Sequence, residues 1–198
     1  MVATNRSTAV AQLKAVWRIL SNDVDAATAY GQIENTSYAQ RALVRAQFAL
    51  IEGLSYSLRQ VTLASLHGTE LLTEREVALL REERYSIDEK GRPKTTPQFL
   101  KFPDSLLFSI RMYVKNHGAT FEPDTKQHPG WAAMQRAVKV RDQVTHPKTS
   151  ESLDLSNEDL QSFVDAAAWW KMTMLAMFAA CKEADAYWQT QLKEGNPR

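Results

Sequence analysis

The sequence predicts an all-α protein, a helical bundle of about four to six helices with negligible sheet. Glycine and proline are sparse, at seven each among 198 residues, and they cluster at a few joints. The segments between these joints are rich in Ala, Leu, Glu, Gln, Lys and Arg, which favour helices. No segment shows the alternation of apolar and polar residues between turn residues that is typical of strands. The length suits one domain, residues 1–198.

Turn and capping residues place the helices of the first half. Gly68 ends a long apolar-periodic segment, and Thr73 with Glu76 forms a capping-box pattern that opens the next helix. The helices expected in this half cover residues 8–20 with a looser, turn-rich continuation to residue 34, residues 37–67 and residues 73–85.

The second half begins with an irregular segment, residues 86–104, which contains three prolines and one glycine. A loop of this length is uncommon in a compact domain, so we expect a mobile insertion or a functional flap. Helices are expected at residues 105–116, at residues 129–146 and at residues 156–193. Pro147 must end the second of these, because it excludes its predecessor from the α region.

The charge, the cysteine content and the apolar segments limit which partners and which cellular compartment the sequence suggests. Lys and Arg number 24 against 23 Asp and Glu, so a net charge of +1 gives no global attraction to polyanions. The lone cysteine, Cys181, lies among apolar residues and suggests a core thiol in a reducing compartment. The longest unbroken apolar run, residues 172–181, is shorter than the ~20 residues a bilayer needs. We therefore expect a cytoplasmic protein that makes no membrane contact.

The end of the helix at residues 129–146 carries the one group of residues that suggests chemistry. On a helical wheel Arg141 and Thr145 lie within the apolar arc, and Asp142 and His146 lie at its edge. A buried arginine is costly unless its charge is paired or faces a polar cavity or interface. Asp142 and His146 are four residues apart, which suits a carboxylate that holds an imidazole in one tautomer. A structural ion pair and a helix C-cap explain the same residues without any catalysis.

The segment Arg141-Asp142-Gln-Val-Thr-His146-Pro147 resembles the signature of the HEPN superfamily (higher eukaryotes and prokaryotes nucleotide-binding). Those proteins are all-α bundles with an Arg, a polar residue, a short spacer and a His at the end of a late helix. The resemblance covers residues 36–193 and leaves the first helix and the proline-rich loop at residues 86–104 as additions.

The resemblance implies a metal-independent endoribonuclease whose site is composed of two protomers across a two-fold interface. Arg141 and His146 would be its catalytic residues: Arg141 would hold the phosphate and His146 would act as general acid or base. Asp142 would orient His146, Thr145 could donate a hydrogen bond, and Lys148 would add positive charge. Some HEPN proteins also carry a carboxylate on an early helix, for which Glu52 is the nearest match. The wheel places Glu52 beside three arginines on what looks like a solvated ion-pair face, so we leave it out of the catalytic set.

The expected partners follow from the same resemblance: an RNA substrate, a second copy of the chain and, if the protein is a toxin or a defence effector, an antitoxin protein. We expect no metal, because the histidines have no ligand-like spacing with each other or with Cys181. We expect no cofactor, and no glycine-rich phosphate loop is present. The alternative is a catalytically inactive HEPN-like dimerisation or regulatory module in which Arg141 and His146 form interface pairs.

Overall fold

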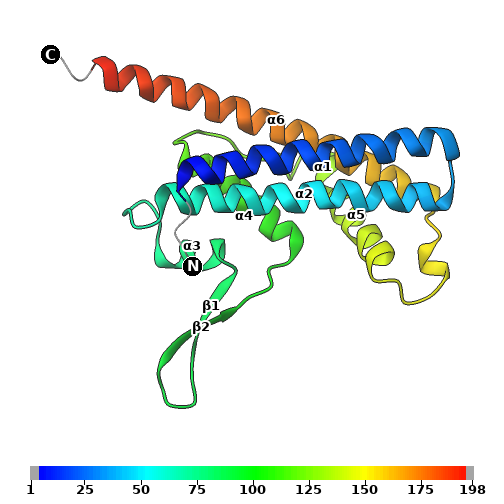
Figure 1. Cartoon of the computed structure of the whole chain (residues 1–198), viewed down its shortest axis with the longest axis horizontal. Helices are drawn as coiled ribbons and strands as arrows, with labels where there is room; N and C mark the ends of the chain where they lie inside the picture. Colours follow the sequence, from blue (N-terminus) through cyan, green and yellow to red (C-terminus); the bar gives the residue numbers. More distant parts are fainter. Residues whose placement is uncertain (1–4, 195–198) are drawn as a thin grey trace.

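A computed structural model describes residues 5–194, and in this part of the chain it contains six α-helices and a single two-stranded sheet (Figure 1). The prediction of an all-α helical bundle is confirmed. The termini of the predicted domain, residues 1–4 and 195–198, lie outside the described residues. The elements are α1 (Arg6–Glu34), α2 (Ser37–Leu66), α3 (Glu74–Leu80), β1 (Glu83–Ile87), β2 (Pro93–Pro97), α4 (Phe102–Asn116), α5 (Pro129–Thr145), a 3₁₀ turn η1 (Glu151–Leu153) and α6 (Asn157–Glu194).

The two first helices form an antiparallel pair along one side of the molecule (Figure 1). The looser continuation expected at residues 20–34 is wrong, because α1 is a continuous helix to Glu34. Asn35 ends it in the left-handed conformation (φ 38°), which asparagine tolerates, and its N–H donates to the Gly31 carbonyl. Gly53 lets the pair approach closely, because a Cβ there would lie 2.7 Å from Leu20 Cδ1.

Helix α2 is the centre of the bundle, and it contacts each of the other five helices. Its fully buried side chains include Ile51, Leu54 and Leu58, which join one hydrophobic core with residues of α1, α4, α5 and α6. Because neighbours surround α2, polar side chains on most of its sides must find partners within the protein.

The segment expected to be irregular contains an antiparallel hairpin instead. Helix α3 ends at Leu80 rather than near residue 85, β1 follows, and β2 occupies the middle of the predicted loop. The hairpin projects away from the helices (Figure 1), and most of its side chains are exposed. Since it adds almost nothing to the core, its strands show no buried apolar face that sequence patterning could detect.

The last helices start and stop close to the predicted residues. Helix α4 begins three residues early, at Phe102, with Pro103 in its first turn, where its missing N–H costs nothing. Ser156 caps α6: its hydroxyl accepts from the Asp159 N–H at 3.1 Å, and the Asp159 carboxylate accepts from the Ser156 N–H at 3.0 Å. Within residues 5–194 no helix is both long and apolar enough to cross a membrane.

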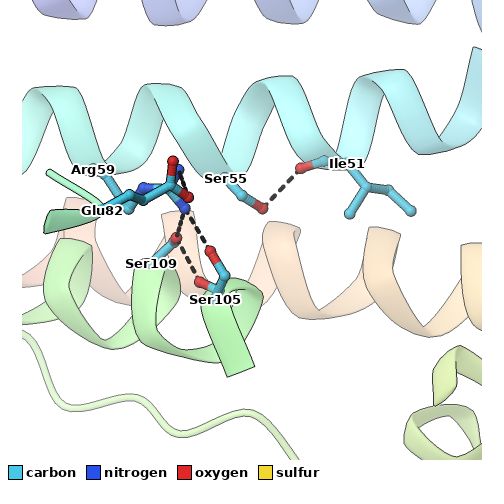
Figure 2. Close-up of polar contacts among 6 residues, drawn as sticks. All are labelled: Ile51, Ser55, Arg59, Glu82, Ser105 and Ser109. Carbon is cyan, nitrogen blue, oxygen red and sulfur yellow. Dashed lines mark hydrogen bonds and ion pairs between the residues drawn. The ribbon is translucent and has the colours of Figure 1, made fainter. Parts of the chain in front are cut away.

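A buried arginine joins α2 to α4 and to the base of the hairpin (Figure 2). The Arg59 side chain is 6% exposed; Nη1 donates to Ser105 Oγ at 2.6 Å and to Ser109 Oγ at 3.4 Å, and Nη2 donates to Glu82 Oε1 at 2.9 Å. Desolvation lowers the pKa of Arg59, and Glu82 opposes that effect. Glu82 itself adopts a left-handed conformation (φ 55°), and its carbonyl accepts from the Gln98 N–H at 2.7 Å. Arg59 thus fixes the residue at which the chain turns from α3 into the hairpin.

Replacing Arg59 tests this anchor. Arg59→Ala should lower the free energy of unfolding by about 3 kcal/mol, the lower end of the range for breaking a buried ion pair, because Glu82 is partly solvated. Chemical denaturation monitored by circular dichroism measures the change. Arg111→Ala is the matched control: its ion pair with Glu122 is solvent-exposed and should change stability by less than about 1 kcal/mol. Equal effects of the two substitutions would contradict the anchor.

Cys181 is buried on α6, as its apolar neighbours predict, and burial raises its pKa to about 11. Because the thiolate is the reactive form, the native protein should react with iodoacetamide at pH 8 far more slowly than the protein unfolded in guanidinium chloride. Mass spectrometry over a time course measures both rates. Similar rates would show that the thiol is accessible in the native state.

Candidate active site at the end of α5

The candidate site lies at the C-terminal end of α5. The last helical residue is Thr145, and Pro147 prevents further helix, as the sequence predicts. His146 has already left the helix (φ −128°, ψ 61°), although its N–H still donates to the Asp142 carbonyl at 2.9 Å. Its side chain is exposed, and within residues 5–194 its imidazole makes no hydrogen bond or ion pair. The imidazole of His146 is therefore presented to solvent.

The Arg141 guanidinium, about one turn earlier on α5, contacts two aromatic rings and two carboxylates. Its guanidinium carbon lies 5.8 Å from the ring centre of Phe48 and 5.5 Å from that of Phe102, and these rings pack edge to face. Nη1 donates to Asp142 Oδ1 at 2.6 Å, and Nη2 forms an ion pair with Glu52. The side chain is 20% exposed, and Nε is buried without a partner in the described residues. The positive charge of Arg141, which the helical wheel placed among apolar residues, is thus paired with carboxylates, as its partial burial requires.

Glu52 is the residue that the sequence interpretation left out. It lies on α2, and its carboxylate, which is 44% exposed, forms an ion pair with the Arg141 guanidinium of α5. The helical wheel identified residues that share a side of α2, but it could not show that α5 packs against that side. The signal was present in the sequence as one carboxylate among three arginines at helical spacing.

The predicted contact between Asp142 and His146 is absent, because the Asp142 carboxylate binds Arg141 instead. Side chains four residues apart meet only while both residues are helical, and His146 is not. The Thr145 hydroxyl donates to the Arg141 carbonyl at 2.7 Å, a local bond that leaves its oxygen as an acceptor. Lys148 is exposed in the following loop, and no hydrogen bond or ion pair within residues 5–194 involves its side chain.

Two arginines that sequence reasoning did not assign to the site fix the loop that carries His146. Arg45 Nη2 donates to the Val144 carbonyl at 2.5 Å, and Arg41 Nη1 donates to the Leu153 carbonyl at 3.0 Å. Both come from α2, on the side that carries Glu52. Arg45 satisfies a carbonyl in the last turn of α5 and places its positive charge at the negative end of the helix dipole.

This arrangement supports two chemical roles with different requirements. The exposed imidazole can accept or donate a proton without any rearrangement. The guanidinium has one carboxylate on each terminal nitrogen, so a phosphate must either share these nitrogens with the carboxylates or displace one of them. Asp142 is the more exposed of the two, at 55% against 44% for Glu52. Displacing Asp142 would leave Glu52 to hold the guanidinium in place.

Comparisons of the chain with family models, with curated proteins and with solved structures find no match. Within residues 5–194, no group of three or more His, Cys, Asp or Glu side chains is arranged to bind a metal ion. The chemistry of this site is therefore indicated by its own residues and by the motif they form.

The contact between Arg45 and the Val144 carbonyl can be tested by substitution. We call this contact the clamp. Arg45→Ala should raise amide exchange several-fold in the last turn of α5, because the Val144 carbonyl loses its partner and the helix end frays. Hydrogen–deuterium exchange followed by mass spectrometry measures this on peptides that cover residues 140–153. Arg45→Lys should restore part of the protection, and Arg75→Ala, an exposed arginine of α3, is the matched control. Exchange that is unchanged in Arg45→Ala would contradict the clamp.

Proposed function

We propose that this protein is a metal-independent endoribonuclease of the HEPN type. One observation carries the proposal: Glu52 of α2 binds Arg141 of α5, one helical turn before the exposed His146. The HEPN-like motif supplies an arginine and a histidine, and the family's early-helix carboxylate now has a counterpart in contact with the arginine.

The proposed reaction is cleavage by the RNA 2′-hydroxyl. A general base takes the proton of this hydroxyl, its oxygen forms a bond to the adjacent phosphorus, and the bond from phosphorus to the 5′-oxygen breaks. A general acid protonates the leaving 5′-oxygen, and the products carry a 2′,3′-cyclic phosphate and a free 5′-hydroxyl. Arg141 would bind the phosphate oxygens and stabilise the charge that develops on them.

The single histidine that each chain would contribute to the site must then be complemented by a second group. The two proton transfers of this reaction need two groups, and the HEPN resemblance supplies the second by two-fold symmetry, with the partner's His146 beside the first. The functional unit would be a homodimer with a composite site. Lys148 would add positive charge at the edge of the site, and the Thr145 oxygen would accept a hydrogen bond there.

The same proposal sets the cellular context. With a net charge of +1, the protein lacks the general attraction that would bind any RNA tightly, so a folded or partner-delivered RNA suits it better. As a toxin or defence effector it would act in the cytoplasm, and a toxin would need a neutralising antitoxin protein.

A second candidate function rests on the occupancy of Arg141. Both of its terminal nitrogens are bound to carboxylates in the free chain, which is how a purely structural ion pair would look. In that case the protein is an inactive HEPN-like module for dimerisation or regulation, and His146 only caps α5. The variants below distinguish the two functions.

His146→Ala should reduce cleavage of a total cellular RNA pool by at least ~100-fold, the usual value of general acid–base catalysis, while helix content and stability persist. Arg141→Ala should reduce cleavage by a similar factor, and Arg141→Lys should recover only part of the activity, because an ammonium cannot reproduce the planar fork of the guanidinium.

The two carboxylates that bind Arg141 should matter less. Glu52→Gln should reduce cleavage less than Arg141→Ala does, since the amide still accepts a hydrogen bond. Asp142→Asn should retain most activity, because Asp142 holds neither the imidazole nor, once displaced, the phosphate.

The matched control is Lys139→Ala, an exposed lysine on the same helix, which should cleave like the wild type. Activity should persist in EDTA, and mass spectrometry should find cyclic phosphate ends. If a folded His146→Ala cleaves as the wild type does, or if neither protein cleaves the pool, the inactive module replaces the nuclease.

A further inference from the structure

The hairpin β1–β2 carries apolar side chains that cover no part of its own chain. The register pairs Tyr85 with Thr95 and Ile87 with Pro93, so these four side chains share one face of the hairpin. Tyr85 is 61% exposed and Ile87 is 72% exposed. A two-stranded hairpin is marginally stable in water by itself, and this one is anchored only at its base, by Arg59 and Glu82 (Figures 1 and 2).

The hydrogen bonds at the two ends of the hairpin fix which residues point outward. The Gln98 N–H donates to the Glu82 carbonyl, and the Asp88 N–H donates to the Arg92 carbonyl at 2.9 Å. Because bonded and non-bonded pairs alternate in an antiparallel ladder, residues 84 and 86 of β1 face β2. The backbone groups of residues 83, 85 and 87 therefore point away from β2, as do those of residues 93, 95 and 97 of β2.

The two outer edges differ in what they can bind. On β2, two of the three outward positions are Pro93 and Pro97, which have no N–H and prevent another strand from pairing there. On β1, Glu83, Tyr85 and Ile87 all have free N–H groups, and within residues 5–194 no other strand pairs with this edge. The hairpin therefore has one open edge, on β1, and one edge closed by proline, on β2, so another strand can be added only beside β1.

We propose that the outer edge of β1 pairs antiparallel with β1 of a second copy of the chain, about a two-fold axis at Ser86. In this register Tyr85 lies opposite the partner's Ile87, and Arg84 lies opposite the partner's Asp88, and each pair occurs twice. Aromatic–β-branched pairs and pairs of opposite charge both stabilise neighbouring strands. The result is a four-stranded sheet whose two outer edges are both closed by proline.

The neighbouring register fits the side chains less well. A shift by two residues places Tyr85 opposite itself and Arg84 opposite Ser86, so both charge pairs and both tyrosine–isoleucine pairs are lost. The Asp88 carboxylate already forms an ion pair with Arg92, and hydrogen bonds from the Arg92 N–H, from the Lys90 N–H and from the Arg92 side chain hold its pKa below the usual range. The partner's Arg84 would add a second cation to this existing pair.

The strands are short, so the contact is small and the dimer should dissociate on dilution. The contact involves neither Arg141 nor His146, and it does not depend on the proposed nuclease activity. The Tyr85→Pro and His146→Ala variants therefore test the two proposals separately.

Proline substitutions test the edge. Sedimentation of the full chain over a range of concentrations should show a reversible, concentration-dependent shift to higher mass, which starts from the 22.4 kDa chain or, where the proposed nuclease dimer also forms, from that dimer. Tyr85→Pro should abolish the shift, because it removes an outward N–H without breaking the ladder to β2. The matched control is Thr95→Pro, which makes the same change on the opposite edge and should leave dimerisation intact. A wild-type chain whose mass does not rise with concentration, or equal loss of the rise in both variants, would overturn the proposal.

Disulfide trapping tests the register. Residues opposite each other in a bonded pair have Cα atoms about 5.5 Å apart, within reach of a disulfide. A mixture of Tyr85→Cys and Ile87→Cys should therefore form a disulfide-linked heterodimer under mild oxidation, faster than either variant alone. Thr95→Cys should not crosslink, and the buried Cys181 should not compete. Equal crosslinking of all variants, or crosslinking only of Tyr85→Cys with itself, would overturn this register. A monomer whose β1 edge binds a strand of another protein would overturn the self-pairing.

Discussion

The architecture depends on four charged side chains on one side of α2. Arg41, Arg45, Glu52 and Arg59 follow one another at intervals of four and seven residues, so they project from the central helix in nearly the same direction. Each reaches a different later segment: η1, the last turn of α5, Arg141, and the base of the hairpin together with α4. The apolar core packs the helices together, but these contacts fix the irregular segments against them.

The helices were largely predictable from the sequence, because their caps and periodicity are local properties. The Thr73 and Ser156 caps and the stop at Pro147 all lie where the sequence places them. The hairpin could not be predicted, because its apolar residues are exposed and its prolines looked like loop residues. For the site, Arg141 and His146 were recognisable as a motif, whereas the role of Glu52 depends on which helix packs against α2, a long-range property that a helical wheel does not contain.

The two carboxylates on Arg141 shape how the site would work. Pairing with two carboxylates offsets part of the cost of burying the guanidinium, which lies close to the rings of Phe48 and Phe102. The same pairing makes any phosphate compete with a carboxylate, so binding would be weak for phosphates that do not also engage neighbouring groups. Weak binding of generic phosphates agrees with the near-neutral charge of the whole chain.

The loop between α5 and α6 has both of its ends fixed on one rigid helix, through Arg45 at the Val144 carbonyl and Arg41 at the Leu153 carbonyl. Beyond His146, its interior, residues 147–152, is mostly exposed and carries none of the core. Insertions or replacements between the two anchors would therefore leave the helices in place. Substitutions in this loop can change the shape and charge of the surface beside His146 while the helices stay in place. The loop is therefore where related chains can diverge in what they recognise.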